Sequence, residues 1–165
     1  MYKQLMERFT AVSFSGAKLN IYRATPTNRP KAVVHISHGM AEHAKRYAWF
    51  MQVLKEAGYA VYAHDIRGHG YTYAKNSSKG HFSDKHGLDQ LLHDLDFVID
   101  LIKQNHSKIP IFCFGHSLGS ILLLRYVTHS YHRINGIACW NSGIETNFLA
   151  VIGRIILSTE RKFLH

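Results

Sequence analysis

The apolar positions of this chain follow two different periods, which predicts strands that alternate with helices. Short runs rich in β-branched and apolar residues are typical of buried strands, and they cover residues 31–38, 59–64, 109–114 and about 135–140. Near the start, residues 8–24 hold two further β-rich runs, and the turn at Ser15 and Gly16 between them predicts a hairpin.

Three segments between the predicted strands have the period of a helix. In the first, the apolar residues that share one helical face are Tyr47, Phe50, Met51 and Leu54. The second has apolar positions at the same spacing over residues 88–102, and the third runs over about residues 118–130. This alternation predicts an α/β fold: a mostly parallel sheet with helices on both faces, to which the opening hairpin adds an antiparallel edge.

Composition and length favour one globular domain with a core. Of 165 residues, 46% are hydrophobic and 19% are charged, an apolar content too high for a disordered segment. The first ten residues lack the apolar region of a signal peptide, and no run approaches the roughly 20 apolar residues that span a bilayer. We therefore expect a cytoplasmic protein without a transmembrane segment.

The charge of the chain is basic, with 20 Lys and Arg against 11 Asp and Glu and a formal net charge of +9. The basic residues are scattered along the sequence, and no nucleic-acid-binding motif accompanies them. We expect no nucleic-acid partner, whereas a peripheral contact with anionic lipid stays open.

Cysteines and histidines raise the question of a disulfide or a metal site. Cys113 and Cys139 both lie in apolar predicted strands, so we expect two buried thiols, as suits a reducing compartment. Among 13 histidines, His38 and His43 bracket Glu42, but their spacing is one residue longer than the zinc-binding pattern H-x-x-E-H. We expect no metal site and no cofactor.

The segment with the clearest chemistry is Gly115-His116-Ser117-Leu118-Gly119, which fits the pattern G-x-S-x-G between a predicted strand and a predicted helix. In that context the serine stands on a sharp turn with its hydroxyl above a sheet, and the two glycines prevent collisions inside the turn. The helix that follows also points its positive end at the serine. We interpret Ser117 as a nucleophile; an ordinary strand-to-helix turn is the alternative.

A second segment, His38-Gly39-Met40, comes at the end of the strand predicted at 31–38. A serine enzyme of acyl transfer needs two backbone N–H donors for the oxyanion. We predict that Met40 and Leu118 provide them, and that Gly39 allows the backbone to approach the site.

The third segment, DIRGHG at 65–70, follows a strand and is too polar and glycine-rich for the core. We expect Asp65 and Arg67 to brace this loop by charge-assisted hydrogen bonds, which is a structural role.

These motifs occur in a fixed order: HGMAEH at 38–43 with Arg46-Tyr47, then DIRGHG, then GHSLGS at 115–120. Together they resemble the monoacylglycerol lipase and lysophospholipase branch of the α/β-hydrolases, also labelled serine aminopeptidase S33, over about residues 5–145. The resemblance implies an α/β-hydrolase fold and a serine esterase acting on a small acyl ester, a monoacylglycerol or a lysophospholipid. It also implies that residues 1–145 form the N-terminal part of the core and that residues 146–165 begin a lid.

The acid and the base of a catalytic triad follow the serine in this fold. No aspartate follows Ser117; the later carboxylates and histidines are Glu145, Glu160, His129, His132 and His165. His129 lies about 18 Å along the predicted helix from Ser117, whereas a general base must come within about 3 Å of the hydroxyl. We therefore expect a truncated chain that lacks the last strands of the fold, with the triad acid and base, and that is inactive alone.

Two further functions stay open. A prolyl aminopeptidase has the same fold, although the HGGPG-like loop usual in such enzymes differs from Met40-Ala41-Glu42-His43. The second alternative is a non-catalytic role for the chain as a fragment, because the triad acid and base are missing from it.

Overall fold

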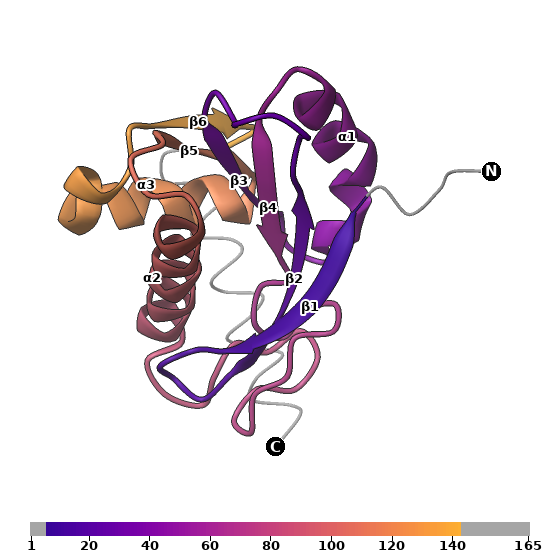
Figure 1. The fold of residues 1–165 in the computed structure, drawn as a ribbon. Helices are drawn as coiled ribbons and strands as arrows, with labels where there is room; N and C mark the ends of the chain where they lie inside the picture. Colours follow the sequence, from indigo (N-terminus) through magenta and orange to yellow (C-terminus); the bar gives the residue numbers. More distant parts are fainter. Residues whose placement is uncertain (1–5, 143–165) are drawn as a thin grey trace.

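The sheet at the centre of the molecule separates helix α1 from helices α2 and α3 (Figure 1). The computed structural model describes residues 6–142. Helix α1 packs on one face of the sheet, and α2 and α3 pack on the other. The helical segments are η1 (Ala44–Tyr47), α1 (Ala48–Glu56), α2 (Gly87–Asn105), α3 (Leu118–Ser130) and η2 (Tyr131–Arg133), of which the η segments are 3₁₀ turns. None of the helices within the described range is both long and apolar enough to cross a bilayer.

Six strands form this sheet in the order β1-β2-β4-β3-β5-β6 within residues 6–142. They are β1 (Glu7–Val12), β2 (Lys18–Ala24), β3 (Val33–Ser37), β4 (Ala60–His64), β5 (Ile111–His116) and β6 (Gly136–Trp140). Strand β2 pairs antiparallel with β1 and with β4, and the other three pairs are parallel. The predicted class is confirmed: a mostly parallel sheet, helices on both faces and an antiparallel hairpin at the start.

The pairing of β3 with β5 places two of the sequence motifs at one edge of the sheet. Ser37 of β3 lies opposite Gly115 of β5 in parallel register. The chain segments that follow these residues therefore leave the sheet at the same level. In open α/β sheets, the crevice at the carboxyl ends of the strands is where ligands bind.

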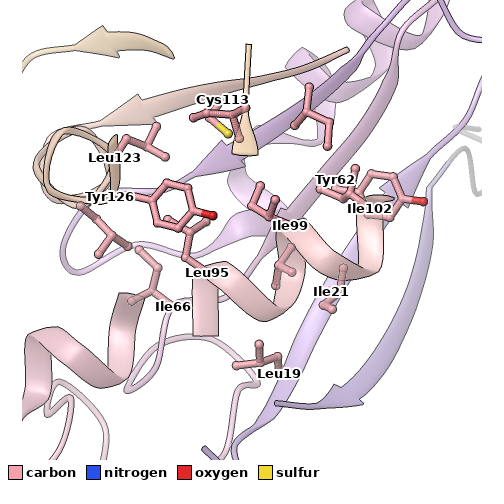
Figure 2. Packing of buried hydrophobic residues seen from close by; sticks show 14 of the residues in the cluster. Leu19, Ile21, Tyr62, Ile66, Leu95, Ile99, Ile102, Cys113, Leu123 and Tyr126 are labelled. Atoms are coloured by element: carbon pink, nitrogen blue, oxygen red, sulfur yellow. The ribbon is translucent and has the colours of Figure 1, made fainter. Parts of the chain in front are cut away.

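The larger of two apolar cores fills the space between the sheet and helices α2 and α3 (Figure 2). Leu95, Ile99 and Ile102 of α2 recur with the helical period that predicted this helix, and all three are fully buried. They meet side chains of the sheet and of α3, among them Leu19, Ile21, Tyr62 and Leu123. A smaller core, which includes Ile36, Met51 and Val61, lies beneath α1.

The burial of the cysteines differs from the prediction. Cys113 is buried, and burial raises the pKa of its thiol to about 12, but Cys139 is exposed, so the expectation of two buried thiols was wrong. Cys139 belongs to β6, which pairs with β5 alone among the described strands and lies at the edge of the sheet. The predicted lid at 146–165 lies outside the described residues.

Two histidines are buried as a pair on β3 and β4. His35 Nε2 lies 3.0 Å from His64 Nδ1, and the two rings stack with their centres 5.2 Å apart. Burial lowers the pKa of His64 from 6.5 to about 4 and lowers the pKa of His35 well below its usual value. Both rings are therefore neutral at pH 7.

We predict that mild acid destabilises the fold through this pair. In the unfolded chain the histidines bind protons near pH 6.5, but folded His64 does so only near pH 4. The unfolded state thus binds protons first, and the free energy of unfolding falls between these two pH values, by about 3 kcal/mol for His64. Urea denaturation at a series of pH values measures this loss.

Substitutions can distinguish the contribution of this pair to the pH dependence of unfolding from that of other titrating groups. His64→Phe should make the pH dependence of unfolding shallower, whereas His93→Gln, on the exposed side of α2, should leave it unchanged. An unchanged pH dependence in His64→Phe would contradict the assignment.

Candidate active site

Ser117 stands at a sharp turn between β5 and α3 in a backbone conformation that few L residues adopt. Its φ is 50° and its ψ is −114°, which is a strained combination for a residue with a Cβ. The turn is fixed from both sides, because Ser117 N–H donates to the Trp140 carbonyl at 2.9 Å and its own carbonyl accepts from Ile121 N–H at 3.1 Å. Strand β5 runs through His116, so the turn begins without a linker.

The glycines on either side of Ser117 allow two close backbone approaches. A Cβ on Gly115 would lie 2.6 Å from the backbone N of Ser120. A Cβ on Gly119 would lie 2.0 Å from the carbonyl oxygen of Ser37, at the end of β3. The first glycine permits the turn itself, and the second permits the start of α3 to pack directly against β3.

The loop after β3, residues 38–42, lies beside this turn, and three of its backbone groups are bound to side chains. Gly39 N–H donates to the Glu42 carboxylate, and Ala41 N–H donates to His69 Nε2 at 3.2 Å. The Gly39 carbonyl accepts from His38 Nδ1 at 2.7 Å. Between these groups, Met40 N–H has no acceptor within residues 6–142.

His38 connects this loop to the end of β4. It is fully buried, and its Nε2 accepts from Ile66 N–H at 2.8 Å while its Nδ1 donates to the Gly39 carbonyl. Burial and the neighbouring His69 lower the pKa of His38. The ring is therefore neutral, as one nitrogen must accept and the other must donate.

Glu42 links the 38–42 loop to the residue before Ser117. Its Oε1 accepts from His116 Nδ1 at 2.9 Å and from Tyr47 OH at 2.8 Å, and its Oε2 lies 3.4 Å from Arg46 Nη1. Burial raises the pKa of the Glu42 carboxyl, but the hydrogen bonds from His116, Gly39 and Tyr47 outweigh it and lower the pKa below its usual value. Sequence reasoning met Glu42 only in a rejected zinc-binding pattern and in the HGMAEH motif, and it predicted no contact for this side chain. Its position four residues before Arg46 was the available signal.

An aromatic groove of about 620 Å³ borders the same cluster on the α1 side of the sheet. Polar and aromatic side chains both line it; the lining residues are Glu42, Arg46, Tyr47, Trp49, Phe50, Phe114, His116 and Trp140. Because His116 and Trp140 both contact the turn at Ser117, the groove lies next to that residue.

The DIRGHG segment is held by two separate anchors. Asp65 accepts from Ala44 N–H, Tyr71 N–H and Asn20 Nδ2, each at 2.8 Å, and so ties the segment to η1 and β2. Arg67 is buried and does not contact Asp65; its Nε lies 2.9 Å from Asp94 Oδ2 of α2.

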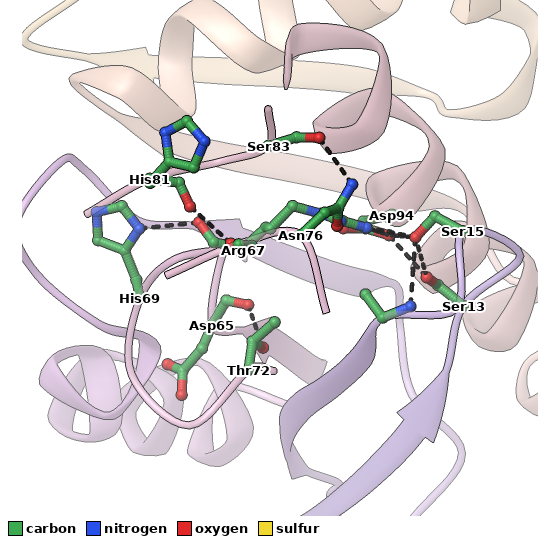
Figure 3. A network of polar contacts seen from close by, with 12 residues as sticks. Ser13, Ser15, Asp65, Arg67, His69, Thr72, Asn76, His81, Ser83 and Asp94 are labelled. Atoms are coloured by element: carbon green, nitrogen blue, oxygen red, sulfur yellow. Dashed lines mark hydrogen bonds and ion pairs between the residues drawn. The ribbon is translucent and has the colours of Figure 1, made fainter. Parts of the chain in front are cut away.

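Figure 3 shows the buried pair between Arg67 and Asp94 within its hydrogen-bond network. Arg67 also donates to Ser15 and to Asn76 Oδ1, and Ser13 Oγ donates to Asp94 at 2.7 Å. The network joins the turn of the first hairpin, the loop after β4 and helix α2.

Neither His129 nor His132 comes near Ser117. No histidine within residues 6–142 hydrogen-bonds to its hydroxyl. His129 lies in the last turn of α3 and His132 beyond it, both at the opposite end of the helix from Ser117. Glu145, Glu160 and His165 lie outside the described residues. In the part of the chain that the structure describes, no three His, Cys, Asp or Glu side chains gather as metal ligands.

Comparison with known proteins gives related sequences and related solved structures. The model of the family described as "Serine aminopeptidase, S33" matches residues 28–163. A monoacylglycerol lipase of Mycolicibacterium smegmatis is 35% identical over 102 residues, 62% of this chain and 34% of the relative. Phospholipase YtpA of Bacillus subtilis is 32% identical over 111 residues, 67% of this chain and 40% of the relative.

A carboxyl esterase of Bacillus coagulans, whose crystal structure contains glycerol, is similar in fold. The TM-score is 0.77 at 26% sequence identity, and the match covers 95% of this chain and 52% of the esterase. The chain thus spans about half of this esterase, and 34% and 40% of the two curated relatives.

We predict that the contact between α3 and β3 tolerates no side chain at Gly119. Gly119→Ala should lower the free energy of unfolding by about 1–3 kcal/mol or more, because its Cβ would overlap a backbone oxygen. Gly87→Ala is the matched control, since a Cβ there makes only an ordinary contact of 3.5 Å with Phe82. Equal stability of the two variants in urea denaturation would refute the close approach.

A second prediction concerns the buried ion pair. Asp94→Asn leaves the Arg67 guanidinium buried without a counter-charge, so the free energy of unfolding should fall by about 3–5 kcal/mol. The double variant Arg67→Met/Asp94→Leu should recover most of that loss, since no buried charge remains. If the double variant were no more stable than Asp94→Asn, the loss would have another cause.

Proposed function

This chain belongs to the serine aminopeptidase S33 family of α/β-hydrolases, and from that premise we propose that it carries the nucleophile and the oxyanion donors of a serine carboxylic-ester hydrolase. The family match confirms the resemblance that the three sequence motifs indicated. The family is one of lipase and esterase type, and the proposal assigns roles to individual residues of this chain.

Ser117 is the proposed nucleophile, and the observation that carries the proposal is its strained conformation at the strand-to-helix turn. Strain of this kind persists where surrounding structure holds it, and it is characteristic of functional sites. Here the turn lies between the end of β5 and the start of α3, whose positive end favours developing negative charge. A serine in this position presents its hydroxyl above the sheet in hydrolases of this fold.

The geometry of the 38–42 loop, which we call the oxyanion loop, supports Met40 N–H as one oxyanion donor. A trans peptide is planar, so the carbonyl of Gly39 and the N–H of Met40 point in opposite directions. His38 binds that carbonyl, which directs the Met40 N–H away from His38. The neighbouring N–H groups of Gly39 and Ala41 are bound to Glu42 and His69, so Met40 alone of the three is available.

Leu118 N–H is the second proposed donor. It is the first residue of α3, and its N–H has no acceptor within the described residues. The first N–H groups of a helix have no partner inside the helix. Two such donors aimed at one point stabilise the negative oxygen that forms when a serine attacks an ester carbonyl.

The proposed reaction proceeds through an acyl-enzyme. Ser117 Oγ attacks the ester carbonyl carbon while a base takes its proton, and the carbonyl oxygen becomes an oxyanion held by Met40 and Leu118. The tetrahedral intermediate then collapses, the C–O bond to the alcohol breaks, and the alcohol leaves with the proton from the base. Water repeats the sequence on the acyl-enzyme and releases the acid. The base and its acidic partner come from outside residues 6–142.

The proposed substrates are monoacylglycerols or lysophospholipids. Relatives of this chain are named a monoacylglycerol lipase and a phospholipase. The groove beside Ser117 agrees with such a substrate, because it combines aromatic rings with the polar groups of Glu42, Arg46 and His116. An ester with an apolar acyl chain and a polar alcohol matches both surfaces.

We predict that Ser117→Ala abolishes hydrolysis in a chimera that supplies a base. In it, this chain is joined to the part of the Bacillus coagulans esterase beyond the matched region. Hydrolysis of a monoacylglycerol and of p-nitrophenyl esters should fall by at least about a thousandfold, because the residual activity of such enzymes without the nucleophile is small. Ser78→Ala, in an exposed loop, is the matched control.

The same assay separates the alternatives. Full activity in Ser117→Ala would exclude Ser117 as the nucleophile. Preferential cleavage of proline anilides would favour a prolyl aminopeptidase over an esterase. A folded chimera that is inert on every substrate would favour a non-catalytic role for this chain.

A further inference from the structure

Ala41, directly after the proposed oxyanion donor, has a backbone conformation that needs external support. Its φ of 57° lies in the left-handed region, which is unfavourable for a residue with a Cβ. Such a conformation persists only where neighbouring groups hold it. The group bound to Ala41 is His69, whose Nε2 accepts the Ala41 N–H at 3.2 Å.

The second ring nitrogen of His69 fixes its protonation state. His69 Nδ1 lies 3.1 Å from the carbonyl oxygen of Arg67 (Figure 3), which can only accept, so Nδ1 carries the proton. Nε2 then has a lone pair directed at Ala41. A second proton on Nε2 would place two donors face to face, and the hydrogen bond to Ala41 would be lost.

The ring of His69 is held in place by its neighbours. It stacks on Phe82 with ring centres 5.9 Å apart and meets the ring of His38 at 5.4 Å. Only 8% of the residue is exposed. The ring therefore has little room to move, and its hydrogen bond restricts the position of Ala41.

Several titratable groups surround this contact. His38 faces it directly, and the carboxylates of Asp65 and Glu42 act electrostatically on His38. The Arg67 guanidinium is turned away toward Asp94. On the segment that supplies Phe82, the nearest titratable side chains along the chain are His81 and Asp84, which lie 3.2 Å apart, and Lys79, Lys85 and His86 lie further along it.

We propose that His69 is a positioning residue of the oxyanion loop, which holds Ala41 N–H while its ring is neutral and releases the loop when the ring is protonated. This proposal rests on the proposed function, in which Met40 is an oxyanion donor. His69 does not touch the Met40 peptide; it acts through Ala41. The loop that shapes the oxyanion site is thereby sensitive to pH.

The contact can be tested in the full chain by NMR, without any catalytic assay. Over a pH titration, long-range ¹H–¹⁵N spectra should follow the His69 ring from its Nδ1-protonated tautomer to its charged form. The amide signals of Met40 and Ala41 should shift with the same midpoint as the His69 ring. Amide hydrogen exchange at Ala41, corrected for its intrinsic pH dependence, should accelerate roughly five- to tenfold over that transition, as expected for one lost hydrogen bond.

Three variants make the test specific. His69→Phe keeps the stack on Phe82 but cannot accept, so exchange at Ala41 should be fast at every pH. His69→Gln retains an acceptor that does not titrate, so the pH response at Ala41 should disappear. His43→Gln, an exposed histidine adjoining the same loop, should leave the response unchanged.

Either of two results would overturn the proposal. One is that Ala41 exchange in His69→Phe equals that of the wild-type chain. The other is that the wild-type Met40 and Ala41 signals do not follow the His69 ring through the titration. Neither result depends on Ser117. A failure of the proposed function would appear instead as unchanged ester hydrolysis when Ser117→Ala is introduced into the chimera.

Discussion

The contact between Gly119 and the end of β3 is the constraint on which the rest of the site depends. A Cβ at this position would lie 2.0 Å from the Ser37 carbonyl, so the start of α3 meets the sheet with no side chain between them. That approach places the turn at Ser117 beside the loop after β3. The two proposed oxyanion donors, one on each side of this contact, can converge only because it is so close.

Buried polar groups then hold the loops that this contact brings together. His38 and His69 bind the 38–42 loop as neutral rings, and Glu42 joins that loop to His116. Asp65 ties η1, which follows the loop, to the segment after β4. Each of these groups is costly to bury unless its hydrogen bonds are complete. The loops beside Ser117 are therefore fixed by a set of mutually satisfied hydrogen bonds.

The histidines of this chain differ in role according to where the fold places them. His35 and His64 lie in the sheet and link its stability to pH, whereas His38 and His69 lie under the 38–42 loop and set its geometry. The abundance of histidine raised the question of a metal site, and the spacing of the histidines in the sequence argued against one. Because these rings bind backbone groups and each other, their chemistry here is that of neutral donors and acceptors.

The sequence by itself determined the elements, the family and the position of Ser117. Periodicity located α2 through Leu95, Ile99 and Ile102, and G-x-S-x-G located the turn, because both depend on residues close together in the chain. Only the tertiary structure decided that Glu42 contacts His116, that Arg67 pairs with Asp94 and not with Asp65, and that Cys139 is exposed. These depend on strand order and on the direction of side chains from distant segments, and no local pattern specifies either.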